Sequence, residues 1–352
     1  MDNSADRINI SFNNNFYKEI VSAIFIDEKR ITMCGDGTCF IHDLRTQEDT
    51  YIFSKPTGED AVFYPSYSGL CISQDRTLLG FKSDLSPYIY DICNKTLQEP
   101  FKRYSLRSQT FLDFNFKNDL IIYNDGYYTC FNNKGFADVA QISYFEPSLD
   151  IYLPEFHKGI SCHPKENTFL FCVANALYSI DINTNELKVI NTACSCKKAQ
   201  YSPNGEWVFI RSNHNYIFVI KSSELVEEEY LHPQRIGHYN HFYKDARFHP
   251  TDSIMLLLTK QGVLEYWDYS KNKLIASQTI SNEKIIGHSL CISPEGSRIL
   301  VVSKGKLSLL DAPLSIRRPY KTILTYLILC NFIDTNSLPK DILREIFIKY
   351  AR

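Results

Sequence analysis

Three features of the sequence predict an all-β fold. The chain has 352 residues, of which 44% are hydrophobic and 14% aromatic, and aromatic side chains fit the half-buried surface of a pleated sheet. Short apolar runs alternate with polar turns along most of the chain, as in β-hairpins. One strand pattern also recurs at a regular interval. Together these features predict a large strand-rich core and exclude general disorder.

The recurring pattern is an apolar strand, a polar turn, and a second apolar strand that ends near an Asp. The second strands end at residues 43, 91, 132, 181, 221, 268 and 311. Their mean spacing is about 45 residues, which matches the length of one four-stranded propeller blade. The sequence therefore predicts a seven-bladed β-propeller.

Four turns that contain proline support this interpretation. Pro presets φ at the first central position of a turn, and the residues that follow it complete a hairpin. An apolar run follows each turn, which places a strand directly after it. The four turns are Cys162–Asn167, Tyr201–Gly205, Phe248–Asp252 and Ile292–Gly296.

Several of these positions resemble the WD-repeat propeller family. Trp267-Asp268 is the terminal dipeptide of that family, and Gly237-His238 opens the same repeat. The resemblance covers roughly residues 16–316 and implies a network of His, Asp and hydroxyl groups within each blade. Because few repeats keep these motifs, we expect packing to hold most blades. The other motif positions are Asp36, Gly37, Gly287, His288 and Asp311.

The N-terminal segment alternates polar and apolar residues from Arg7 to Phe12, as a half-buried strand does. We expect this strand, at about residues 7–12, to pair with the last blade and close the ring. Closure removes the free sheet edges that invite aggregation. The predicted propeller domain spans residues 1–316.

Residues 317–352 change to a helical pattern and are predicted to form a short C-terminal α-helical extension of two helices. The segment Leu338–Phe347 is similar to the opening helix of an F-box, and its C-terminal place resembles that of PRANC and SOCS-box tails. This resemblance implies docking to a ubiquitin-ligase adaptor subunit. Packing on the propeller and binding to a membrane surface are the alternatives. The implied docking residues are Leu338, Pro339, Ile342, Leu343, Ile346 and Phe347.

Charge and hydropathy narrow the classes of partner. With 38 basic and 40 acidic residues, the chain lacks the basic excess of a nucleic-acid binder. No apolar run approaches the roughly 20 residues of a membrane span. The 11 cysteines have no regular spacing, which favours a reducing compartment. We therefore expect a cytoplasmic protein.

Motifs of catalysis are not found in the sequence. It contains no phosphate loop, no Gly-x-Ser-x-Gly elbow and no His-Glu-x-x-His helix. Cys194 and Cys196 are the most metal-like pair, but a zinc site needs further ligands at suitable spacing. Four histidines lie in the sixth repeat. The repeat motif accounts for His238, and a proline turn accounts for His249. We expect no metal, no cofactor and no enzymatic activity. The histidines are His232, His238, His241 and His249.

The predicted function is a scaffold that presents one propeller face to a protein or peptide partner, because binding residues concentrate on loops. The loop before the first strand of the sixth repeat mixes aromatic and polar residues, as interfaces do. An ordinary connecting loop is the alternative there. Other possible functions are a propeller hydrolase or lyase with a central-channel site, and a purely structural subunit. The candidate face residues are Tyr239, Asn240, His241 and Tyr243.

Overall fold

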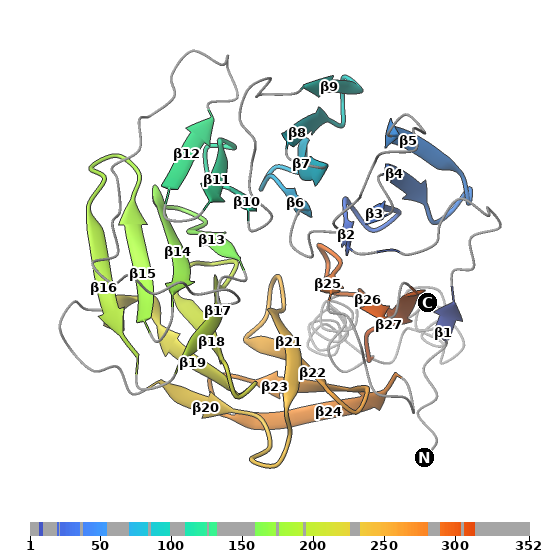
Figure 1. The fold of residues 1–352 in the computed structure, drawn as a ribbon. Coiled ribbons are helices and arrows are strands. Elements are labelled where there is room, and N and C mark those ends of the chain that lie inside the picture. Colours follow the sequence, from blue (N-terminus) through green and yellow to red (C-terminus); the bar gives the residue numbers. More distant parts are fainter. Residues whose placement is uncertain are drawn as a thin grey trace, which may run out of the picture.

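The strands form seven antiparallel sheets arranged in a ring (Figure 1). Six sheets contain four strands, and one contains three. The predicted all-β propeller is therefore confirmed, but the described residues hold six complete four-stranded blades and not the predicted seven. The computed structural model describes residues 7–9, 20, 22–35, 38–54, 70–83, 86–98, 110–124, 127–131, 159–173, 176–192, 195–225, 233–280, 289–303 and 306–313.

The N-terminal half supplies two blades and the three-stranded sheet. The blades are β2 (Ser22–Phe25), β3 (Arg30–Gly35), β4 (Thr38–Asp43) and β5 (Asp49–Ser54), then β6 (Leu70–Ile72), β7 (Leu78–Ser83), β8 (Ser86–Asp91) and β9 (Thr96–Gln98). The three-stranded sheet consists of β10 (Thr110–Phe114), β11 (Leu120–Asn124) and β12 (Tyr127–Phe131).

Three blades follow along the chain. They are β13 (Ile160–Cys162), β14 (Thr168–Val173), β15 (Ala176–Asp181) and β16 (Leu187–Asn191); β17 (Cys196–Tyr201), β18 (Trp207–Ser212), β19 (Ile217–Lys221) and β20 (Gln234–Ile236); and β21 (Tyr243–Phe248), β22 (Ile254–Thr259), β23 (Val263–Asp268) and β24 (Lys273–Thr279). A 3-10 turn, η1 (Ser222–Glu224), follows β19.

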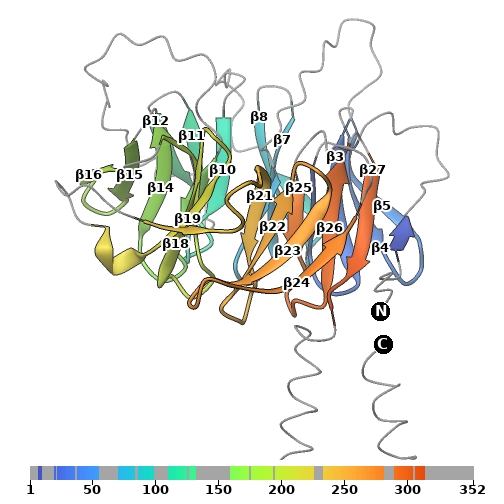
Figure 2. The same ribbon diagram turned by 90° about the horizontal axis from the view of Figure 1, so that it is seen from below.

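The last blade combines the two ends of the described chain. It consists of β25 (Ser289–Ile292), β26 (Arg298–Ser303), β27 (Lys306–Asp311) and β1 (Arg7–Asn9). Ile8 of β1 lies opposite Leu309 of β27 in an antiparallel register. An N-terminal strand thus closes the ring, and the remainder of the segment expected at residues 7–12 lies outside the described residues. Seen from the side, the sheets stand next to one another in one layer (Figure 2).

Each blade is held by apolar packing on both of its faces, as β22 illustrates. All six residues of this strand are buried. Leu256 and Leu258 pack with Leu290 of the last blade. Their neighbours Met255 and Leu257 pack toward the other side, in a cluster with residues of the β17–β20 blade. Successive residues of a strand point to opposite faces, so a nearly continuous apolar run is the expected sequence for a strand whose sheet lies between two others.

The Asp at the end of the third strand of a blade shapes the following turn. Asp43 Oδ1 accepts hydrogen bonds from the backbone N–H groups of Arg45 (2.8 Å) and Thr46 (3.1 Å). Asp91, Asp181 and Asp268 bind their own turns in the same way. The residue four positions later adopts a positive φ in each case. These residues are Gln47 (61°), Lys95 (56°), Asn185 (57°) and Asn272 (50°).

Histidines of two proline turns reach into the next blade. His163 Nε2 lies 3.2 Å from the carbonyl oxygen of Gly205, and the ring of His249 occupies the space beside Gly296. Both glycines have positive φ, +79° and +76°. A glycine is required at each position because a Cβ would overlap the histidine ring and the backbone conformation disfavours other residues.

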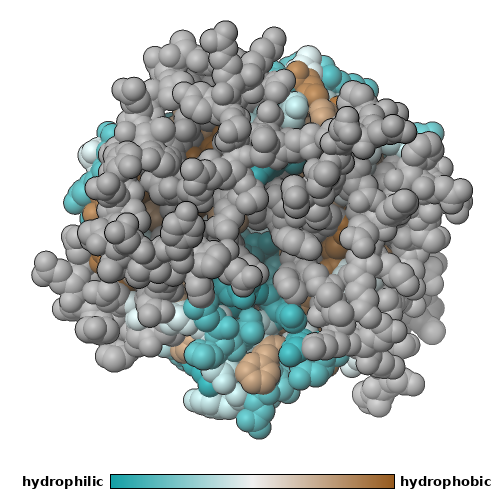
Figure 3. All heavy atoms as spheres, viewed as in Figure 1, coloured by the Kyte–Doolittle hydropathy of each residue, from teal (hydrophilic) through white to brown (hydrophobic). Residues whose placement is uncertain are grey.

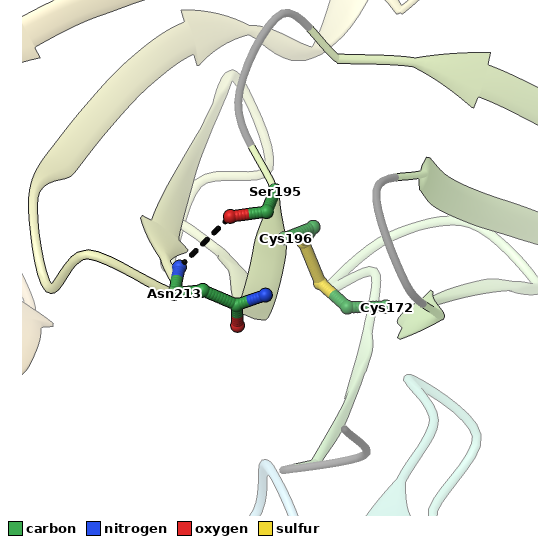
Figure 4. Close-up of a disulfide and its surroundings, with 4 residues drawn as sticks. All are labelled: Cys172, Ser195, Cys196 and Asn213. Atoms are coloured by element: carbon green, nitrogen blue, oxygen red, sulfur yellow. Dashed lines mark hydrogen bonds between the residues drawn. A yellow bond between two sulfur atoms is a disulfide. The ribbon is translucent and has the colours of Figure 1, made fainter. Parts of the chain in front are cut away.

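A disulfide joins two neighbouring blades (Figure 4). It links Cys172 of β14 to Cys196 of β17, whose Cα atoms lie 5.5 Å apart. Beside it, the backbone N–H of Asn213 donates to Ser195 Oγ at 3.3 Å. Cys196, one of the most metal-like cysteines in the sequence, thus uses its sulfur in this covalent bond.

The predicted tail at residues 317–352 lies outside the described residues. Within the part of the chain that the structure describes, no helix has the length and apolar character needed to cross a membrane.

Replacing Gly296 with alanine should destabilise the protein by about 2–4 kcal/mol. The substitution combines a strained backbone, which costs about 1–3 kcal/mol, with overlap against His249, and overpacking costs a similar amount. Urea unfolding of the variant measures the loss. Gly159→Ala is the matched control, because Gly159 also has a positive φ (+127°) but nothing lies within 4 Å of the added Cβ. Equal losses in the two variants would contradict the contact with His249.

Candidate functional site

Three loops meet at one rim of the propeller. They are the β18–β19 hairpin (residues 213–216), the loop from β20 to β21 (237–242) and the β22–β23 hairpin (260–262). The backbone N–H of Tyr243 donates to Asn215 O at 2.8 Å, and that of Lys260 donates to Phe242 O at 2.9 Å. These hydrogen bonds join the three loops into one surface, which we call the loop face.

Gly237 allows the loop to begin. It has a φ of +97°, and a Cβ there would collide with the ring and hydroxyl of Tyr243. The hydroxyl of Tyr243 in turn accepts a hydrogen bond from the backbone N–H of His238 at 2.8 Å. The glycine of the Gly-His motif thus makes room for a tyrosine that fixes the next residue.

Glu265 of β23 is the buried centre of the loop face. Its Oε2 accepts hydrogen bonds from the Tyr243 hydroxyl and from Trp267 Nε1, both at 2.8 Å. Its Oε1 lies 2.6 Å from Nδ1 of His241. Only 2% of the residue is exposed, so these three partners replace the water that a buried carboxylate would otherwise need. We call this group the Glu265 network.

The negative charge of Glu265 affects Tyr243 directly. Burial is the largest cause that raises the pKa of the tyrosine hydroxyl, and the charge and the hydrogen bond of Glu265 raise it further. The hydroxyl therefore stays protonated and remains a donor to the carboxylate. His238 completes the group through ring contacts, because its imidazole meets Trp267 edge-on at a centroid distance of 5.2 Å.

The outer layer of the loop face is a stack of aromatic rings around one arginine. The guanidinium carbon of Arg235 lies 3.8 Å from the ring centroid of Tyr216 and 4.5 Å from that of Tyr239. Phe242 stacks on Tyr216 at 6.0 Å. Tyr239 is 77% exposed and Phe242 is 44% exposed. We call Tyr216, Arg235, Tyr239 and Phe242 the aromatic–arginine stack.

The space-filling view shows the described residues as a largely hydrophilic surface around the ring centre and below it, with a small apolar patch in the lower part (Figure 3). Large exposed apolar side chains are few among the described residues, and two of them, Tyr239 and Phe242, belong to the loop face. Exposed aromatic groups set in a polar surround are typical of binding surfaces.

The structure places the predicted face residues in two layers. Tyr239 and Asn240 are exposed and His241 is partly buried. Tyr243 was predicted to be a surface contact, and this is wrong: it is 1% exposed and lies inside the Glu265 network. The reason is the missing side chain of Gly237, which leaves the space that the tyrosine ring fills.

The repeat-motif residues have unequal roles. Trp267 donates to Glu265, while Asp268 caps its own turn. The His and Asp network implied by the family resemblance is therefore replaced in this blade by a carboxylate from the strand itself. Asp311 ends β27. Several predicted positions lie outside the described residues: Asp36, Gly37, Gly287, His288, and the docking residues Leu338, Pro339, Ile342, Leu343, Ile346 and Phe347.

Sequence reasoning missed Glu265 and most of the aromatic–arginine stack. The signal for Glu265 was a single charged residue inside an otherwise apolar strand, Val263–Asp268. Such a residue in a strand buried on both faces must find hydrogen-bond donors. Tyr216 lies in the β18–β19 hairpin, Arg235 on β20 and Phe242 in the loop after β20, and no local sequence pattern unites them.

Charged side chains also meet on the innermost strands of the ring. Lys198 Nζ of β17 lies 2.7 Å from Asp245 Oδ1 of β21. Arg247 donates through Nε to the carbonyl of Leu290 on β25 at 2.7 Å. It also donates through a terminal nitrogen to Gln200 Oε1 on β17 at 2.7 Å. These contacts tie three consecutive blades together near the ring centre.

Burial and mutual charge set the protonation of this inner cluster. Burial by itself raises the pKa of Asp245, but the charges of Lys198, Arg247 and Arg211 hold it well below its ordinary value. Burial, together with repulsion from Arg247, lowers the pKa of Lys198 to about 7.

On the opposite side of the ring, burial raises the pKa of Asp113 to about 6. The Asp113 carboxylate accepts from the backbone of Cys162 on the next blade at 2.8 Å. These groups bridge neighbouring strands, which is a structural use of their charge.

The arrangement of the sheets is that of a WD40-repeat β-propeller. A crystal structure of the WD40 repeats of RRP9 is similar to this chain, with a TM-score of 0.67 and 11% sequence identity, over 88% of this chain and 98% of that chain. In all, 1770 chains of solved structures match, so the fold by itself is too widely shared to identify a partner. No family model and no curated protein matches the sequence.

Removing the carboxylate of Glu265 should show that Glu265 and Tyr243 stabilise the fold cooperatively. Glu265→Ala leaves two buried donors without an acceptor, so we expect a loss of about 2–4 kcal/mol. Tyr243→Phe should cost about 1–2 kcal/mol in the wild-type background and close to nothing in the Glu265→Ala background, which a double-mutant cycle in urea measures. Glu295→Ala, at an exposed turn, is the control and should cost less than about 0.5 kcal/mol. Additive losses would refute the coupling.

Proposed function

We propose that the protein is a non-enzymatic scaffold that binds a protein or peptide partner on its loop face. The observation that carries this proposal is the aromatic–arginine stack, which presents two exposed rings, Tyr239 and Phe242, beside one guanidinium. Tyr, Phe and Arg are enriched in the centres of protein interfaces. The similarity to WD40 propellers supports the same class of function at the level of the fold.

The rigidity of the loop face favours binding. Backbone hydrogen bonds join its loops, and the Glu265 network anchors the middle loop from beneath. Arg235 is held between two rings and also donates to the carbonyl oxygen of Tyr239 at 2.8 Å. A surface that is ordered before the encounter loses less conformational entropy on binding. The chemistry suits a peptide with an apolar or aromatic anchor and a carboxylate near it.

We also propose that the sheet β10–β12 serves as the third blade of a seven-bladed ring. Leu112 and Phe114 pack with Cys71 and Ile89 of the β6–β9 blade. On its other side, Phe111 and Ile121 belong to one apolar cluster with residues of the β13–β16 blade. The sheet therefore fills one position between two blades, as the repeat spacing requires.

The loop face should be required for capture of a partner. Tagged full-length protein is used to capture proteins from a lysate, and the captured set is compared between variants by mass spectrometry. We expect Tyr239→Ala combined with Phe242→Ala to reduce capture of a reproducible partner at least tenfold, because two contact rings are lost. Tyr51→Ala removes a ring that is 50% exposed on an outer strand and should have no effect. A partner retained by the double variant, or lost equally in Tyr51→Ala, would contradict the proposal.

The C-terminal segment suggests a second binding function. We propose, from the similarity of Leu338–Phe347 to an F-box helix, that the tail recruits a ubiquitin-ligase adaptor subunit to the propeller. Leu343→Asp should abolish co-purification of an adaptor, since a charge would interrupt the predicted apolar stripe. Arg344→Asp, which lies off that stripe, is the matched control. An adaptor that is absent from the wild-type eluate, or unaffected by Leu343→Asp, would rule out this role.

A further inference from the structure

We propose that His238, His241 and Glu265 form a binding site for a divalent transition-metal ion, with Zn²⁺ as the preferred ion. Each residue offers one ligand atom, and the three atoms lie within 4.8 Å of one another. From the sequence alone no metal is expected here, because the repeat motif accounts for His238 and a turn accounts for His249. The inference goes beyond the proposed scaffold function and does not depend on it.

The donor set suits the ion. Two imidazole nitrogens and one carboxylate oxygen are the three protein ligands of one common class of zinc site, in which water or another group takes the fourth position. Imidazole ligands favour Zn²⁺ and its neighbours over Mg²⁺ and Ca²⁺, which prefer oxygen alone. The set is also open on one side, because His238 is exposed and the side chain of His241 is 38% exposed.

Glu265 is held as a metal-ligating carboxylate usually is. Its Oε2 is occupied by the donors Tyr243 and Trp267. This leaves Oε1 directed toward His241, at 2.6 Å from Nδ1. Carboxylates that bind metals are typically oriented by hydrogen bonds from residues behind them. Tyr243 and Trp267 therefore supply the supporting layer, which an accidental approach of a histidine to a glutamate would not provide.

The geometry requires only small movements of the exposed rings. Zinc–ligand distances of about 2.0–2.2 Å in a tetrahedron separate the ligand atoms by about 3.3–3.5 Å. The distance between His241 Nδ1 and Glu265 Oε1 must therefore lengthen by about 0.8 Å, and any other separation in the group must shorten by at most about 1.3 Å. The centroids of His238 and His241 lie 4.9 Å apart. Because both histidines are on a loop and the carboxylate is buried, the rings move and Glu265 stays in place.

The decisive measurement is metal binding by the full-length protein after treatment with a chelator. Zn²⁺ is titrated by calorimetry, and Co²⁺ is used as a spectroscopic probe, since its absorption distinguishes nitrogen and oxygen ligands from thiolates. We expect the wild type to bind one equivalent of Zn²⁺ more than the His238→Ala/His241→Ala variant. Each single histidine variant should bind at least tenfold more weakly. The added equivalent should also raise the melting temperature of the wild type alone.

Two further variants separate a metal site from a merely structural hydrogen-bond network. His214→Ala removes a histidine from the neighbouring hairpin of the same loop face and should leave the affinity unchanged. Tyr243→Phe keeps all three ligands but loosens Glu265, and the expected loss is about 10–100-fold. Equal stoichiometry and affinity in the wild type and the double histidine variant would overturn the proposal, as would thiolate absorption as the only cobalt signal. Partner capture in the presence of chelator tests the scaffold function separately.

Discussion

Closure of the ring is the constraint on which the rest of this structure depends. Each sheet buries apolar side chains on both faces, so an open ring would expose two apolar surfaces to water. At the junction between the last blade and the first, Met33 and Phe40 belong to one core with Leu300 and Leu309. Polar contacts support the same junction, because the Glu28 carboxylate accepts from the backbone of Glu295 (2.8 Å) and from Ser297 Oγ (2.7 Å). Apolar burial and hydrogen bonds thus meet at the junction between the last blade and the first.

The packing of the sheets in this ring fixes the positions of the residues in the loop face. Tyr243 begins an innermost strand, Glu265 lies on a strand packed between two blades, and Asn215 belongs to the preceding blade. Their mutual distances are therefore set by how neighbouring sheets pack and only secondarily by the loops. This explains how a few polar side chains can hold a buried carboxylate in place beneath exposed rings.

Much of the fold could be predicted from the sequence because its determinants are local. The strand-ending Asp and the proline turns recur at a regular interval, and their roles in the turns follow from side-chain and backbone chemistry. The candidate site was only partly predictable, since its members come from different strands and loops. Glu265 has the charge of a surface residue but lies in a buried strand. Tyr243 belongs to the correct loop region but faces inward, because the neighbouring glycine leaves a space that a sequence pattern does not reveal.

The turns that are capped by an Asp show which parts of the fold depend mainly on residues nearby in the sequence. Each turn is shaped by hydrogen bonds that the Asp accepts from the backbone N–H groups of the residues after it, and by a positive φ four residues later. The fourth strand that follows is the most exposed of its blade, as the alternating burial of β24 illustrates. The perimeter of the disc is therefore shaped largely by local turns, whereas side-chain contacts between blades link its innermost strands. We expect sequence change in these turns to act mainly within one blade, and change at Lys198, Asp245 or Arg247 to affect the neighbouring blades as well.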